Sequence, residues 1–195
     1  MYQPYVMKPY FILLLFVFFI PITLLAQSPG YVIQRNNDTI RCHVKNAMFG
    51  GAKYKSSDGF QKISIDNIRE YQLTKDSSIH EAINLKDGAD PEFVLVLERG
   101  KICLYVQYIY TYTGTTSTTT TNWYAIKNNA PAVMIKTNGL NLFGPDHNDR
   151  KNEFFNLIKD DSKIASAYTA ENSFSFNTIR KYIQQYNQAA SSQKK

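Results

Sequence analysis

Apolar residues alternate with polar ones, or follow one another in short runs, over most of the chain, and this pattern is typical of β-strands. The densest such stretch is Glu92–Lys127. Within it, Phe93–Glu98 and Lys101–Tyr112 predict two strands joined by a tight turn, and Trp123–Lys127 predicts a third. The threonine-rich residues 115–121 have no apolar anchor, so we expect them to form a mobile loop.

Shorter strand patterns lie on both sides of this stretch. They cover residues 31–46, 53–73, 78–85 and 132–136, and the first predicts a hairpin that turns at Asn36-Asn37-Asp38. In the second strand of that hairpin, apolar and polar residues alternate, so one face should be buried and His43 should face solvent.

The apolar period changes from two to between three and four after residue 148. Asp149–Lys159 predicts a helix with Asp146 or Asn148 as its cap. A second helix follows Ser175, with Phe176, Ile179, Ile183 and Tyr186 on one side. Between the two we expect only a turn leading to Ile164, and Ala189–Lys195 should be a disordered tail.

These elements predict an α+β fold: a mainly antiparallel sheet, curled into a sandwich or barrel-like, with two C-terminal helices packed on it. We expect residues 27–188 to form a single β-rich domain whose helical part covers about 148–188.

The first 26 residues have the pattern of a removable export signal. Lys8 supplies the positive end, Phe11–Ile20 the apolar core, and Pro21 a break before a cleavage site after Ala26. The alternative is an uncleaved anchor, because the apolar run is close to the ~20 residues that span a bilayer. No cysteine sits at the cleavage site, so a lipid-anchored lipoprotein is not expected. The predicted location is periplasmic, outer-membrane-associated or extracellular, with no membrane span after cleavage.

Charge argues against nucleic acid as a partner. The chain has 22 Lys and Arg against 16 Asp and Glu, a formal net charge of +6. The basic residues are scattered along predicted strands instead of forming a block with interleaved aromatics.

The two cysteines, Cys42 and Cys103, both lie in predicted strands. In an oxidising compartment they could form a disulfide if those strands are neighbours or face each other. The alternative is a pair of buried thiols that act as small apolar side chains.

Candidate chemistry is sparse. Asp146, His147 and Asp149 form the one cluster that resembles a metal or acid–base site, which would suit a small hydrolase or metal-assisted enzyme. The same residues are also what a loop needs to turn into a helix and cap it, and this second interpretation is favoured. We find no nucleophile elbow, metal-protease motif, Cys-x-x-Cys or phosphate loop. The sequence therefore predicts a protein that is not an enzyme and has no cofactor.

The tyrosines indicate a binding surface more strongly than the His147 cluster indicates a catalytic site. Tyr108, Tyr110 and Tyr112 should lie on one face of their strand, with Trp123 and Tyr124 on the strand beside it. An exposed ladder would suit a glycan or a peptide. The favoured alternative is a ladder covered by the C-terminal helices.

The residues Gly30-Tyr31-Val32-Ile33 and Asp38-Thr39-Ile40, directly after a signal segment, resemble the start of uncharacterised secreted proteins common in Bacteroidota-type bacteria. Those proteins usually have Asn-Gly-Asp-Thr at the turn, where this chain has Asn36-Asn37-Asp38-Thr39. Later matching segments are Asp66-Asn67-Ile68, Trp123-Tyr124, Phe154-Phe155 and Tyr186-Asn187. The resemblance implies an exported β-rich protein, a domain of unknown function, and brings no known activity.

Together these observations predict an exported, non-enzymatic protein of the cell envelope that acts by binding or assembly. Its partner is unknown, and an envelope protein or a glycan would suit it.

Overall fold

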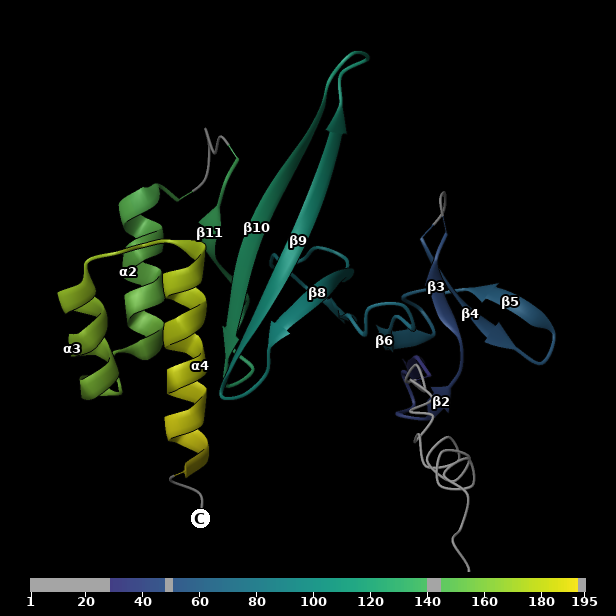
Figure 1. Cartoon of the computed structure of the whole chain (residues 1–195), viewed down its shortest axis with the longest axis horizontal. Helices are drawn as coiled ribbons and strands as arrows, with labels where there is room; N and C mark the ends of the chain where they lie inside the picture. The colour runs from purple at the N-terminus through teal and green to yellow at the C-terminus, as the bar shows by residue number, and fades with distance from the viewer. Residues whose placement is uncertain (1–28, 48–50, 140–144, 193–195) are drawn as a thin grey trace, which may run out of the picture.

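The structure is a computed structural model of the chain, and it describes residues 29–47, 51–139 and 145–192 (Figure 1). The predicted export signal therefore lies outside the described residues. The strands are β1 (Tyr31–Gln34), β2 (Thr39–Arg41), β3 (Val44–Asn46), β4 (Ala52–Ser56), β5 (Gly59–Lys62), β6 (Ile68–Gln72), β7 (Ile79–Ile83), β8 (Glu92–Glu98), β9 (Ile102–Tyr112), β10 (Ser117–Lys127) and β11 (Val133–Thr137). The helices are α2 (His147–Ile158), α3 (Ser162–Glu171) and α4 (Phe176–Ser192).

Eight strands form one antiparallel sheet in the order β11-β10-β9-β8-β7-β6-β1-β2. From β6 to β11 each strand pairs with the next one in sequence, because short connections favour neighbouring antiparallel strands. The remaining strands, β3, β4 and β5, form a separate three-stranded sheet. The α+β fold with an antiparallel sheet is confirmed, and the large sheet is open because its end strands, β11 and β2, do not pair with each other.

The helices cover one face of the large sheet at its β8–β11 end (Figure 1). Ile102 and Leu104 of β9 point toward them and are completely buried, as are Ile179 and Ile183 of α4. Because successive strand residues point to opposite faces, the residues between these, such as Cys103, face away from the helices. They belong to a second apolar cluster on the other side of the sheet.

A third apolar cluster lies at the far end of the molecule, where β1 and β6 pack against the small sheet. Its centre is formed by Val32, Val44 and Ile68, which are buried almost completely. In Figure 1 the small sheet and the helices lie at opposite ends of the long axis, with the large sheet between them.

The prediction of a mobile loop at residues 115–121 is wrong. β10 begins at Ser117, and each of its threonines lies opposite a residue of β9, so that only Thr113–Thr116 turn the chain. Threonine is β-branched and favours strands when a partner strand is available, and β9 supplies that partner. The result is a β9–β10 hairpin that projects well beyond the rest of the sheet (Figure 1).

The helical part is larger than the sequence predicts. Where only a turn was expected, α3 forms a helix capped by the Asp161 side chain, which accepts a hydrogen bond from the Ile164 N–H. The predicted disordered tail is wrong for residues 189–192, because α4 continues to Ser192 and Ala189 packs against the core. Across the described ranges, each helix is too short or too polar to cross a lipid bilayer.

Candidate functional site

The most exposed aromatic residues of the described chain lie on the projecting part of the β9–β10 hairpin, residues 107–122, which we call the arm. The side chains of Tyr108, Tyr110 and Tyr112 are 47%, 78% and 74% exposed. They lie opposite Thr121, Thr119 and Ser117 of β10. Because cross-strand partners share a face, this side of the arm presents three phenol rings beside a row of hydroxyl groups.

The tyrosine ladder is therefore open, and the favoured prediction that the helices cover it is wrong. β9 has 11 residues and so is about 37 Å long. The helices pack against its first half, where Ile102, Leu104 and Val106 enter the core. The second half extends past the helical layer, and its tyrosines remain exposed (Figure 1).

Trp123 and Tyr124 do not join the ladder, which corrects their predicted place in it. Trp123 is 8% exposed and packs edge-on against Phe176 of α4, with ring centroids 4.7 Å apart. Tyr124 is buried on the other face of the sheet, beside its cross-strand partner Tyr105. Adjacent strand residues point to opposite faces, so these two rings could not share a surface.

The cluster around His147 caps α2. The Asp146 carboxylate accepts a hydrogen bond from the Asp149 N–H at 2.8 Å, and the Asp149 carboxylate accepts one from the Asp146 N–H at 3.2 Å. This reciprocal pair satisfies N–H groups that the helix itself leaves without partners. The His147 ring stacks edge-on against Phe174 at 5.2 Å. Within residues 29–47, 51–139 and 145–192, no three His, Cys, Asp or Glu side chains are grouped closely enough to hold a metal ion.

Cys42 and Cys103 are both free thiols, so the disulfide considered from the sequence does not form. Cys42 packs at the edge of the cluster between β1, β6 and the small sheet. Cys103 belongs to the cluster on the face of β9 that points away from the helices. Cys42 lies in the link between β2 and β3, and the two thiols belong to different apolar clusters.

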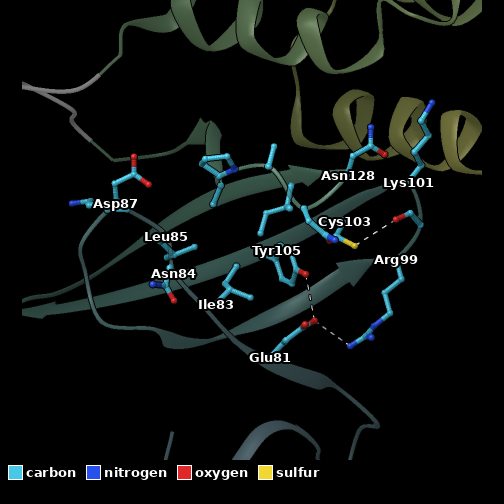
Figure 2. Close-up of a pocket in the computed structure, with 17 residues that line it drawn as sticks. Glu81, Ile83, Asn84, Leu85, Asp87, Arg99, Lys101, Cys103, Tyr105 and Asn128 are labelled. Carbon is cyan, nitrogen blue, oxygen red and sulfur yellow. Dashed lines mark hydrogen bonds and ion pairs between the residues drawn. The ribbon is translucent and has the colours of Figure 1, made fainter. Parts of the chain in front are cut away.

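A groove of about 770 Å³ lies on the sheet face opposite the helices (Figure 2). Its floor contains Ile83, Leu85, Cys103 and Tyr105, and the turn that holds Asn128 closes one side. No histidine is among its lining residues, and the Cys103 thiol contacts the Gly100 carbonyl at 3.6 Å. The groove thus lacks the thiol–imidazole pair that activates a cysteine nucleophile.

Charged groups at one end of the groove bind one another. Glu70 and Glu81 lie directly opposite on β6 and β7, where two carboxylates repel. The Arg99 guanidinium lies between them and donates to Glu70 at 2.8 Å and to Glu81 at 3.3 Å. The Tyr105 hydroxyl also donates to Glu81, at 3.3 Å (Figure 2). Burial, strengthened by the charge of Glu81, raises the pKa of Tyr105.

Glu70 is 5% exposed and is also bound by the Tyr31 hydroxyl, at 2.7 Å. Burial and this carboxylate raise the pKa of Tyr31 to about 12. These contacts join β1, β6 and β7 to the β8–β9 turn. We did not predict them from the sequence, although the register of the β6–β7 hairpin places Glu70 opposite Glu81. The charged groups beside the groove therefore stabilise the contact of β1, β6 and β7 with the β8–β9 turn.

Comparisons with protein-family models, curated proteins and solved structures found no match for this chain.

Proposed function

We propose that the protein is a non-enzymatic assembly module of the cell envelope, exported by its N-terminal apolar segment, whose copies join through the arm. The observation that carries this proposal is the arm itself. It is a two-stranded ribbon, and none of the described strands pairs with the outer edge of Tyr108–Tyr112 or of Ser117–Thr120.

Open strand edges present N–H and C=O groups that readily pair with another strand. Monomeric proteins usually protect such edges with lysine, proline, bulges or a covering element. Residues 107–122 contain no charged residue and no proline, and the β9–β10 register runs without a bulge from Tyr112 to Ile102. The arm therefore has the features of a strand edge that is used for pairing.

A second copy of the chain is the partner that fits best. The chain carries a formal net charge of +6, so two copies repel over most of their surfaces, whereas the arm is uncharged. Two identical edges can pair antiparallel about a two-fold axis, which makes the contact self-complementary. The exposed tyrosine rings would add contact area at small cost in side-chain entropy.

Sedimentation velocity over a range of protein concentrations tests this proposal. We expect the mass of the wild-type particle to rise from one chain to two as concentration increases. The variant Ile109→Lys/Thr118→Lys places one charge on each strand, on the face away from the tyrosines, and should remain a single chain. The control Thr115→Lys/Thr116→Lys adds the same charge at the tip and should associate like the wild type. A wild type that stays single at every concentration, or an edge variant that associates equally well, would overturn the proposal.

Export has its own test. Protein recovered from the envelope of its host should begin at Gln27, because the signal pattern places cleavage after Ala26. Recovery from the cytoplasm with residue 1 intact would contradict the proposed export. It would not affect the proposal that copies join through the arm.

A second candidate function is glycan binding, favoured by the open tyrosine face. Three rings at alternate strand positions lie about 7 Å apart and could stack on successive sugar rings. Titration with neutral oligosaccharides, followed by calorimetry, tests it. The variant Tyr108→Ser/Tyr110→Ser/Tyr112→Ser should lose the heat of oligosaccharide binding, while Ile109→Lys/Thr118→Lys should retain it. The two candidates are thus separated, since each variant alters one surface of the arm.

A further inference from the structure

The small sheet of β3, β4 and β5 carries a row of three lysines. Lys45 lies directly opposite Lys53, and Lys53 lies directly opposite Lys62. Cross-strand partners point to the same face, so the three side chains leave the sheet together. Lys55, two residues beyond Lys53, has the same orientation. We call this surface, with its four lysines, the lysine face.

The lysine face is the outer side of the small sheet. The intervening residues, Val44, Ala52 and Tyr54, point the other way into the apolar cluster that the small sheet shares with β1 and β6. The three strands contain no Asp or Glu. In the part of the chain that the structure describes, none of the four lysines forms a salt bridge.

Like charges directly opposite one another destabilise a sheet. A row of three therefore lowers the stability of the folded chain, and no carboxylate of the described residues forms a salt bridge with it. Such a row is understandable when an anionic partner neutralises it, because the repulsion then becomes attraction. Charge complementarity thus points to a negatively charged ligand.

An exposed aromatic ring lies within the same face. Phe60, opposite Lys55, is 44% exposed. The Lys45 ammonium lies 3.9 Å from its ring centroid, and His43 meets the ring edge-on at 6.0 Å. Phe60 thus lies on the exposed face of the small sheet, beside the lysines, and is not buried in the core.

We propose that the lysine face docks on an anionic phospholipid surface, with the lysines at the headgroup phosphates and Phe60 at the boundary with the acyl chains. Lysine is a compact charge on a flexible stem, which suits the diffuse negative charge of a bilayer; the paired donors of arginine suit a single defined phosphate. An apolar ring among cations is typical of groups that insert at the membrane interface.

Co-sedimentation with vesicles tests the proposal. One set contains phosphatidylcholine alone, and the other contains phosphatidylcholine with phosphatidylglycerol. The wild-type protein should bind the anionic set more strongly, and salt should weaken this preference. The experiment uses the mature chain from Gln27, so the difference between the two sets reports the electrostatic part of its binding.

The decisive variant is Lys45→Gln/Lys53→Gln/Lys62→Gln. Each lysine near an anionic surface contributes about fivefold to binding, so the triple variant should lose on the order of a hundredfold in its preference for anionic vesicles. The control Lys86→Gln/Lys159→Gln/Lys163→Gln removes the same charge from exposed sites elsewhere and should keep most of that preference. Equal losses in the two variants would show a general charge effect and overturn the proposal.

Two further measurements separate this explanation from others. Because the row is repulsive, Lys53→Gln should raise the melting temperature by about 1–3 °C. The triple variant should melt no lower than the wild type, which excludes misfolding as the cause of its lost binding. A fall in melting temperature would contradict the repulsion on which the inference rests. Binding to a soluble polyanion such as heparin, without a preference for anionic vesicles, would overturn the assignment to lipid.

Discussion

The side-chain amide of Asn187 on α4 pairs with the main chain of Ile102 at the start of β9. The Ile102 N–H donates to Asn187 Oδ1 at 2.9 Å, and Asn187 Nδ2 donates to the Ile102 carbonyl at 2.8 Å. The amide therefore acts as a short piece of strand at a point where the sheet meets the helix. Gly100 makes room for it, because a Cβ at that position would lie 2.7 Å from both the amide nitrogen and oxygen.

Replacing Asn187 with leucine should destabilise the fold strongly. Leucine has a similar shape but leaves the Ile102 N–H and C=O without partners at a fully buried residue. Each unsatisfied group costs about 1–3 kcal/mol, so the free energy of unfolding should fall by about 2–4 kcal/mol. Urea denaturation measures this, with Gln188→Leu at the exposed neighbouring position as the control. A stability equal to that of the wild type would show that the pairing does not contribute.

Asp160 should make stability depend on acid pH. Burial would raise its pKa, but hydrogen bonds from Lys127 at 2.7 Å, Tyr186 at 2.7 Å and Lys101 at 3.2 Å outweigh this and hold the pKa well below the usual 3.8. A depressed carboxyl pKa gives stability that is complete above pH 3.8 and is lost as the pH falls through the folded-state pKa.

The variant Asp160→Asn should therefore be less stable than the wild type at pH 7, by about 1 kcal/mol because the site is partly exposed. The difference should shrink below pH 3.8. Thermal unfolding of the two proteins between pH 7 and pH 2 tests this expectation. A difference that stays constant over the whole range would mean that the ionised carboxylate is not what stabilises the fold.

Arg99→Leu should destabilise the joint between β6 and β9 by leaving the buried carboxylate of Glu70 without a cation. Breaking a buried pair costs 3–5 kcal/mol, and since Arg99 is about half exposed we expect about 2–3 kcal/mol. The double variant Arg99→Leu/Glu70→Gln should recover part of this loss, because the amide is uncharged and can still accept the Tyr31 hydrogen bond. Chemical denaturation of the single and double variants measures the coupling. Additive effects would contradict the direct interaction.

The exposed and buried aromatics of the central hairpin should differ in their contribution to stability. Tyr110→Ser should change the free energy of unfolding by less than about 0.5 kcal/mol, as expected for an exposed position. Trp123→Ala should cost about 3–5 kcal/mol, because it leaves a cavity beneath α4. Both should be measured at a concentration where the wild type sediments as a single chain. A large loss in Tyr110→Ser would show that the arm packs against part of its own chain.

Local sequence patterns were enough to predict most of the elements. The β-branched and aromatic residues that predicted strands at Phe93–Glu98 and Lys101–Tyr112 lie in β8 and β9, and Asp146 caps α2 as its position suggested. These predictions succeed because strand alternation and helix capping depend on residues close in sequence. The prediction for the threonine run failed because this strand depends on pairing with β9, which is not visible in the local pattern.

The two candidate surfaces depend on how the elements pack. The sequence by itself determined most of the strands, the helices α2 and α4, and the alternation that places Tyr108, Tyr110 and Tyr112 on one face. Whether that face is covered depends on where the helices end relative to an 11-residue strand, and only the tertiary structure settles it. The lysine face is similar: Lys45, Lys53 and Lys62 are separate in sequence and become a single row only when three strands align in register. A surface arises from the packing of elements, and a local pattern contains no information about which elements will meet.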